Sequence, residues 1–316
     1  MAADWGLRAP LLAALVVLGT TALVVNSMPS LTRTVNAAAH KAHHHKVHVP
    51  TGKKRPTTVP TASVVPGAVT GAVTAPHAQG PCGFSLAASA VSAPVGQCTV
   101  LEIGDSLGND LGWGLQREVS PGSGLRLIQM DKSASGLANT SFYDWPAQLA
   151  VYLRQYHPQL VLVSLGGDDE QGMWVNGSAV QFPSPAWQSA YQGRVRQIAR
   201  EATASGAYLL WVGMPVMQPS YYNQGIEILD SIFRTVVPTL PNATFVSTWT
   251  LFANPQGAFQ ADAKVNGQSA ALREQDGIHY SYVGENVVAT YVLREMAQIY
   301  HVQITPRDPA VITGSR

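Results

Sequence analysis

From residue 99 onward, short runs of apolar residues alternate with longer stretches in which apolar positions recur every three or four residues. The first pattern predicts buried β-strands and the second predicts amphipathic helices. We expect strands at residues 99–105, 125–130, 159–166, 208–215 and 244–249. We expect helices at residues 107–119, 144–155, 185–204, 223–236 and 283–300, the second of them with Asp144 as N-cap and Pro146 in its first turn.

This alternation of strand and helix is typical of a parallel sheet that is covered by helices on both faces. Five strands in about 215 residues predict an α/β protein with a three-layer α/β/α sandwich and a flavodoxin-like five-stranded parallel sheet. Functional sites in such folds lie at the carboxyl ends of the strands. We therefore expect the chemistry of this chain in the segments that follow the predicted strands.

The chain before residue 99 has a different pattern. Residues 1–28 contain a long uncharged apolar run, which predicts a signal peptide or an uncleaved membrane anchor. We favour the anchor, because the run from residue 9 to residue 25 exceeds the ~7–15 apolar residues of a signal peptide. Residues 29–80 are rich in Ala, Val, Thr, Pro and Gly and predict a disordered linker. Residues 81–316 are then the folded domain.

Charge and histidine content support this division. Residues 1–80 contain seven of the 20 basic residues and only one of the 19 acidic residues. The rest of the chain therefore contains 13 basic and 18 acidic residues. An acidic body argues against nucleic-acid binding. Five of the nine histidines lie in residues 40–48, and without a fold to hold them we interpret them as part of a solvated linker rather than a metal site. The sequence has no phosphate loop, CxxC pair or dinucleotide fingerprint, so we expect no cofactor and no metal.

Four short polar segments follow predicted strands or precede the last helix. They are GDSL at residues 104–107, KSASGL at residues 132–137, GGDD at residues 166–169 and DGIH at residues 276–279. In this order, they resemble the four sequence blocks of the SGNH (GDSL-type) hydrolases. The resemblance covers residues 99–300 and implies a serine hydrolase with the SGNH fold.

The resemblance assigns three catalytic roles. Ser106 is the nucleophile, His279 is the general base and Asp276 orients His279. A serine hydroxyl needs a neighbouring base to take its proton, and the base needs a carboxylate to hold its tautomer and to stabilise the imidazolium. The family also implies oxyanion donors at the Ser106 amide, at the amide of Gly136 and at an Asn side chain in the third block.

The third of these donors departs from the family pattern. Asp168 stands where the family has Asn, so a carboxyl group replaces the amide. An ionised Asp168 would repel an oxyanion, and losing one such donor costs about 10²–10³ in rate. A protonated Asp168 would still donate, and we expect partial burial and the adjacent Asp169 to raise its pKa.

Further residues are assigned from their position in the chain. Trp145 and Trp174 follow the second and third blocks and are candidates for lining the substrate pocket, although packing in the core or at its rim is the commoner role of tryptophan. Cys82 and Cys98 flank a short loop before the first strand, and in an exported protein such a pair predicts a disulfide.

A narrower resemblance refines the function. The segments GDSLGNDLGWGL, FYDWP, WVGMP and DGIHYS are similar to an exported bacterial SGNH group, and the cysteine-flanked first strand is similar to SGNH domains fused to membrane acyltransferases that act on surface polysaccharides. This implies an extracytoplasmic esterase, anchored by its N-terminal segment or secreted, that removes acyl groups, O-acetyl above all, from envelope glycans. The resemblance also implies a membrane acyltransferase as a partner. The alternatives are an O-acetyltransferase and a catalytically degenerate glycan-binding or scaffold protein.

Overall fold

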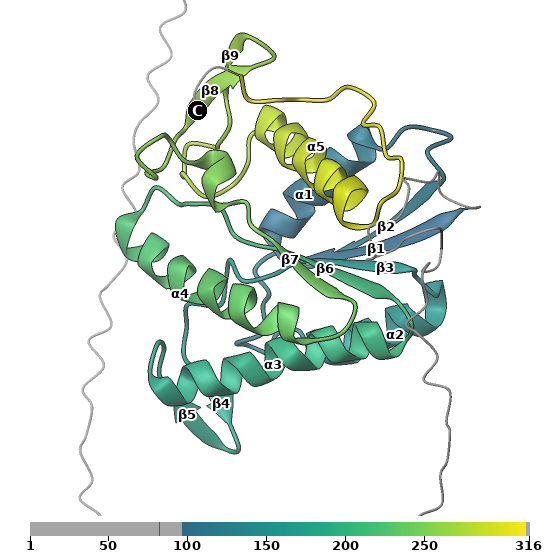
Figure 1. The fold of residues 1–316 in the computed structure, drawn as a ribbon. Coiled ribbons are helices and arrows are strands. Elements are labelled where there is room, and N and C mark those ends of the chain that lie inside the picture. The colour runs from purple at the N-terminus through teal and green to yellow at the C-terminus, as the bar shows by residue number, and fades with distance from the viewer. Residues whose placement is uncertain (1–81, 83–96, 314–316) are drawn as a thin grey trace, which may run out of the picture. The chain divides into compact units, whose positions relative to one another are not determined.

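A five-stranded parallel sheet forms the centre of the protein in a computed structural model that describes residue 82 and residues 97–313 (Figure 1). The strands lie in the order β2-β1-β3-β6-β7. Their bounds are β1 Cys98–Gly104, β2 Leu125–Asp131, β3 Leu160–Ser164, β6 Tyr208–Val212 and β7 Ala243–Val246. All five predicted strands are present, and this order is that of a flavodoxin-like sheet. The predicted fold class is confirmed.

The register of the sheet brings three strand ends together. Strands β1, β3 and β6 are buried along their whole length, which explains their uninterrupted apolar runs. In the ladder, Gly104 at the end of β1 pairs with Asp131 at the end of β2 and with Ser164 at the end of β3. The segments that follow these strands therefore leave the sheet at one edge, and they are the first three blocks found in the sequence.

Helices cover both faces of the sheet, as predicted. Helices α1 and α5 pack against each other on one face, and α2, α3 and α4 lie on the other (Figure 1). Their bounds are α1 Ser106–Glu118, α2 Trp145–Tyr156, α3 Pro185–Ala204, α4 Ser220–Val236 and α5 Tyr282–Ile299. The predicted N-cap at Asp144 is confirmed, because its side chain accepts a hydrogen bond from the Ala147 amide at 3.2 Å.

Two hairpins and two 3₁₀ helices lie outside the predicted pattern. The elements are β4 Met173–Val175, β5 Ser178–Val180, η2 Val237–Thr239, η3 Trp249–Phe252, β8 Asp262–Val265 and β9 Gln268–Ala271. Both hairpins turn on an Asn-Gly pair in which the two residues have positive φ, 50° and 77° at 176–177 and 51° and 83° at 266–267. Asn-Gly is the usual sequence of such two-residue turns, so the sequence did contain this signal.

The predicted disulfide is wrong. Cys82 and Cys98 are both free thiols, with Cys98 fully buried at the start of β1. Burial raises the pKa of Cys82, although a hydrogen bond with Cys98 opposes this, and burial also raises the pKa of Cys98. The fold does not bring the two sulfur atoms to the distance that a disulfide requires.

The expected anchor or signal peptide (residues 1–28) and the expected linker (residues 29–80) lie outside the described residues. Within residues 97–313, no helix is both long enough and apolar enough to cross a membrane.

Candidate active site

Ser106 lies at the point where β1 passes into α1. Gly104 is the last residue of β1, Asp105 is the N-cap of α1 and Ser106 is the first helical residue. A Cβ atom on Gly104 would lie 2.5 Å from the Cα of Gly108 and 2.7 Å from the carbonyl oxygen of Ser164, so only glycine allows this close turn. The result is a serine at a helix N-terminus, where backbone N–H groups and the helix dipole favour negative charge.

Asp105 connects the first and third blocks. Its side chain is fully buried and accepts hydrogen bonds from the amides of Gly166 at 2.9 Å and Gly167 at 2.7 Å. Its other oxygen caps α1 through the Leu107 amide at 3.0 Å. Burial and the charge of Asp168 raise the pKa of Asp105 to about 7, against the effect of these hydrogen bonds. Asp105 had no predicted role, although a polar residue between a buried strand and a helix is an N-cap signal.

The structure brings Ser106, His279 and Asp276 into one hydrogen-bonded chain. Ser106 Oγ lies 2.9 Å from His279 Nε2, and His279 Nδ1 lies 2.6 Å from Asp276 Oδ2. A carboxylate oxygen can only accept, so Nδ1 carries the proton and Nε2 is free to accept from the serine hydroxyl. Residues up to 173 positions apart in sequence thus adopt the arrangement of a nucleophile, a base and an orienting acid.

Asp276 is held in its charged form. Its other oxygen, Oδ1, accepts from the amides of Ile278 at 2.8 Å and His279 at 3.0 Å. Burial would raise the pKa of Asp276, but the hydrogen bonds from the His279 ring and from these two amides outweigh it, and its pKa is lowered. The carboxylate is therefore ionised wherever His279 acts as a base.

Two backbone amides are free to bind an oxyanion. Within residues 97–313, neither the Ser106 amide nor the Gly136 amide donates to a protein acceptor. Gly136 packs against the buried Asp169, whose oxygen would lie 2.2 Å from a Cβ atom at that position. Asp169 accepts from the amides of Leu137 at 2.9 Å and Ala138 at 2.6 Å, and so holds the loop that carries Gly136.

Asp168 lies next to the reacting groups and is half-buried. Its Oδ2 atom is fully buried and has no hydrogen-bond partner in the described part of the chain. Burial raises the pKa of Asp168, and the charge of His279 opposes the rise. The adjacent Asp169 is not a cause of this rise. The charge of Asp168 instead helps to raise the pKa of Asp169, whose side chain accepts from two amides and from the Tyr191 hydroxyl at 2.5 Å.

The two tryptophans occupy different environments. Trp145 is fully buried, and its indole N–H donates to Ser135 Oγ at 2.9 Å. The expectation that Trp145 lines the pocket is therefore wrong, because its side chain has no contact with solvent. Trp145 instead packs in the core and supports the second block through this hydrogen bond. Trp174 is 68% exposed on the β4–β5 hairpin, and its carbonyl oxygen accepts from Arg194 at 2.8 Å.

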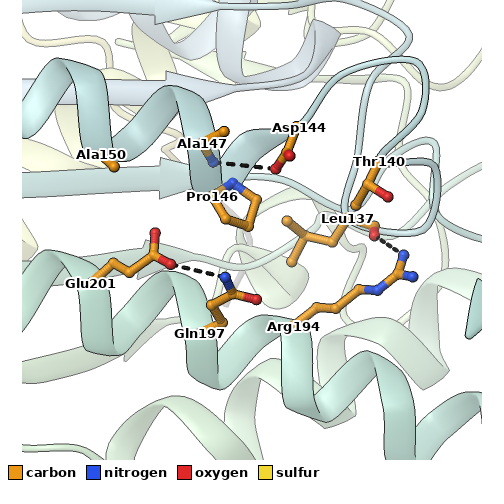
Figure 2. Close-up of a pocket in the computed structure, with 9 residues that line it drawn as sticks. All are labelled: Leu137, Thr140, Asp144, Pro146, Ala147, Ala150, Arg194, Gln197 and Glu201. Carbon is orange, nitrogen blue, oxygen red and sulfur yellow. Dashed lines mark hydrogen bonds between the residues drawn. The ribbon is translucent and has the colours of Figure 1, made fainter. Parts of the chain in front are cut away.

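Figure 2 shows a cavity of about 480 Å³ next to the second block. It lies between the start of α2 and the middle of α3, and it does not include Ser106 or His279. Arg194 on its wall donates to the carbonyl oxygens of Leu137 and Ala138, at 2.9 Å for the latter. Among the described residues, no group of three or more His, Cys, Asp or Glu side chains is placed to hold a metal ion.

Residues 99–295 match a family model described as "Protein of unknown function (DUF459)". The match spans more than half of the chain. The chain belongs to this family. The description of this family states no activity. A fusion to acyltransferases, which the narrower resemblance included, remains a prediction. No curated protein matches this DUF459 chain.

Several solved structures are similar to the DUF459 chain at low identity. TesA shares 20% identity, with a TM-score of 0.43 over 64% of this chain and 99% of TesA. A catalytic mutant of Axe2, an acetylxylan esterase from Geobacillus stearothermophilus, shares 17% identity, with a TM-score of 0.45 over 64% of this chain and 95% of Axe2. A carbohydrate esterase family 3 protein from Talaromyces cellulolyticus shares 13% identity, with a TM-score of 0.43 over 65% of this chain and 98% of that protein.

Proposed function

We propose that this DUF459 protein is an SGNH-type serine esterase that hydrolyses acyl esters through an acyl-enzyme intermediate. The observation that carries the proposal is the chain from Ser106 Oγ through His279 to Asp276, with contacts of 2.9 Å and 2.6 Å. Such contacts lie within the range in which a base takes a proton from a nucleophile.

The reaction has two steps. His279 Nε2 takes the hydroxyl proton of Ser106 while Oγ attacks the ester carbonyl carbon, and the carbonyl oxygen becomes an oxyanion that the amides of Ser106 and Gly136 stabilise. The tetrahedral intermediate collapses, His279 gives the proton to the departing alkoxide, and an acyl-serine remains. In the second step His279 takes a proton from water, the hydroxide attacks the acyl carbon, and the acid is released as Ser106 recovers its proton.

Asp168 determines whether a third donor takes part. When protonated, its carboxyl group donates to the oxyanion as the family's Asn side chain would, and when ionised it repels that charge. The burial that raises its pKa favours the protonated form. We therefore expect the esterase to work best on the acidic side of the pH range in which His279 is still a base.

For the substrate we propose acyl esters of envelope glycans, with acetyl as the acyl group. Trp174, 68% exposed, and Phe142, 50% exposed, present aromatic faces on the segments that follow the third and second blocks, and aromatic faces stack on sugar rings. The apolar run in residues 1–28 and the basic composition of residues 29–80 support an extracytoplasmic domain held to the membrane. A membrane acyltransferase that adds the same acyl group is the partner this location favours.

Covalent labelling tests the proposal. The full-length protein should react with a fluorophosphonate probe at Ser106 and hydrolyse short-chain p-nitrophenyl esters, whereas the Ser106→Ala variant should do neither. A protein that folds but shows no labelling would be a binding or scaffold protein instead. Labelling with slow hydrolysis that accelerates when a glycan acceptor is added, together with acylated glycan as product, would indicate an O-acetyltransferase.

A further inference from the structure

The loop that carries His279 is held by hydrogen bonds of two buried side chains, Asp110 on α1 and Arg273 in the loop itself. It joins β9 to α5, and the side chains of His279 and Asp276 are 37% and 45% exposed. Loops are more mobile than the elements they join. A serine hydrolase nevertheless needs its base within hydrogen-bond reach of the nucleophile, which sits on the separate helix α1.

Asp110 connects α1 to this loop. It lies four residues after Ser106, so the two side chains share one face of the helix. The Asp110 side chain is buried, with 7% of the residue exposed, and its Oδ2 atom accepts a hydrogen bond from the Tyr280 amide at 3.0 Å. Tyr280 directly follows His279, so the nucleophile helix binds the peptide next to the catalytic base.

Arg273 holds the peptide on the other side of His279. It is 4% exposed, and its guanidinium donates to the carbonyl oxygens of Ile278 and, at 2.9 Å, Val216. The rings of Phe252 and Tyr280 lie 5.6 Å and 5.2 Å from its central carbon, close enough for cation–π contact. Arg273 thereby ties the loop to the segment after β6.

The peptide groups around His279 are thus bound in succession. Arg273 binds the Ile278 carbonyl oxygen, the Glu274 amide donates to the His279 carbonyl oxygen at 2.9 Å, and Asp110 binds the Tyr280 amide. Of these contacts, only that of Asp110 comes from the helix that carries Ser106. Besides the contact between Ser106 and His279 themselves, it is the hydrogen bond that joins the nucleophile helix to the loop of the base among the described residues.

We propose that Asp110 is a positioning residue for the esterase, fixing the His279 loop to the nucleophile helix through the Tyr280 amide so that Nε2 stays in reach of Ser106 Oγ. The inference rests on the proposed function for its kinetic test. The bond itself can be examined whether or not the protein is an esterase.

Three variants at Asp110 separate the hydrogen bond from other effects. Asp110→Ala and Asp110→Leu remove the acceptor, and they should lower kcat for p-nitrophenyl acetate by about 10- to 100-fold with KM within about twofold, because misplacing the base affects the chemical step. Asp110→Asn keeps an oxygen that can accept from the Tyr280 amide, and it should recover kcat to within about threefold of wild type.

Glu118 provides the matched control on the same helix. It is 1% exposed and also accepts a hydrogen bond from a backbone amide, that of Asp308 at 3.1 Å, but it lies three turns beyond Ser106. Glu118→Ala should destabilise the fold, as Asp110→Ala does, and leave kcat unchanged. If Asp110 had only a structural role, Asp110→Ala and Glu118→Ala would have the same kcat once each is corrected for its folded fraction. That result would overturn the proposal.

Hydrogen exchange gives a test that needs no activity. In the full-length wild-type protein the Tyr280 amide should be protected, and the Asp110→Ala variant should speed exchange across residues 276–281 while Asp110→Asn does not. Rapid exchange of Tyr280 in the wild type overturns the proposal even if no acceptor-free variant folds. An Asp110→Asn variant as slow in turnover as Asp110→Ala also overturns it, because charge rather than the hydrogen bond would then matter. An inactive wild type with a protected Tyr280 refutes the proposed function alone.

Discussion

Replacing Asp168 by Asn tests how the oxyanion is stabilised in this DUF459 protein. The two side chains have nearly the same shape, but the Asn amide is a neutral donor at every pH, whereas the Asp carboxyl group donates only when protonated. The Oδ2 atom of Asp168 is buried and has no hydrogen-bond partner among the residues that the structure describes, so the substitution breaks no hydrogen bond to them from that atom. Its effect should therefore fall on the oxyanion and on the neighbouring His279.

The magnitude follows from two opposing effects. Gaining a donor beside the oxyanion is worth about 10²–10³ in kcat. The ionised Asp168 also attracts the imidazolium of His279, and losing that attraction reduces the gain. We expect a net increase of about one to three decades above the pKa of Asp168 and a ratio near one below it, where the wild-type carboxyl group is itself a donor.

Turnover of p-nitrophenyl acetate measured from pH 4.5 to 9 checks this expectation, with Asp168→Ala as the control that has neither donor nor charge. The kcat of the Asp168→Asn variant divided by that of the wild type should rise with pH and then level off. A ratio that stays flat and near one at all pH values, with Asp168→Ala equally active, would show that the side chain is not in the oxyanion hole. The proposed match of the third block to the family would then be wrong.

Thermal unfolding gives an independent check on the same residue. The pKa of Asp168 is raised in the folded state, so the folded protein holds this proton more tightly than the unfolded chain does. The free energy of unfolding should therefore fall as pH rises from the unfolded pKa of about 3.9 through the higher folded pKa. The Asp168→Asn variant should lack this decrease, and its Tm should exceed that of the wild type at pH 8 but not at pH 4.

Three further predictions concern the catalytic chain, the buried sheet and the substrate. Ser106→Ala and His279→Ala should each abolish ester hydrolysis while the circular dichroism spectrum stays unchanged. Asp276→Asn should reduce kcat by about 10²–10⁴, because it disturbs the orientation of His279 without removing the nucleophile or the base. Full turnover by Ser106→Ala would refute the mechanism. Glu102 is fully buried in β1, where burial and the charge of the neighbouring Asp131 raise its pKa well above the usual value. Glu102→Gln should therefore raise Tm at pH 8 and not at pH 4, whereas a lower Tm at pH 8 would show that the charge is stabilised. Trp174→Ala should raise KM for an acetylated oligosaccharide several-fold and leave KM for p-nitrophenyl acetate unchanged. Equal effects on both substrates would argue against stacking of a sugar ring on Trp174.

The architecture could be predicted from the sequence because buried strands and half-buried helices each have a characteristic local pattern of apolar residues. Strands β1, β3 and β6 are buried on both faces, so each reads as an unbroken apolar run. The Asn-Gly turns of the two hairpins were also readable, but the flanking strands of three or four residues are too short to show an alternating pattern. The four blocks were recognisable because each catalytic group belongs to a short sequence segment, and these segments follow one another in a fixed order along the chain.

Contacts between distant segments were decided only in three dimensions. Cys82 and Cys98 are free because the fold does not bring them to disulfide distance, and their spacing in the sequence does not report that distance. Trp145 and Trp174 follow similar polar blocks, yet one is closed into the core and the other faces solvent. The bond from Asp110 to Tyr280 joins residues 170 positions apart. Sequence pattern records which side chains avoid water, whereas the partner that a polar side chain meets depends on how helices and loops pack around the sheet.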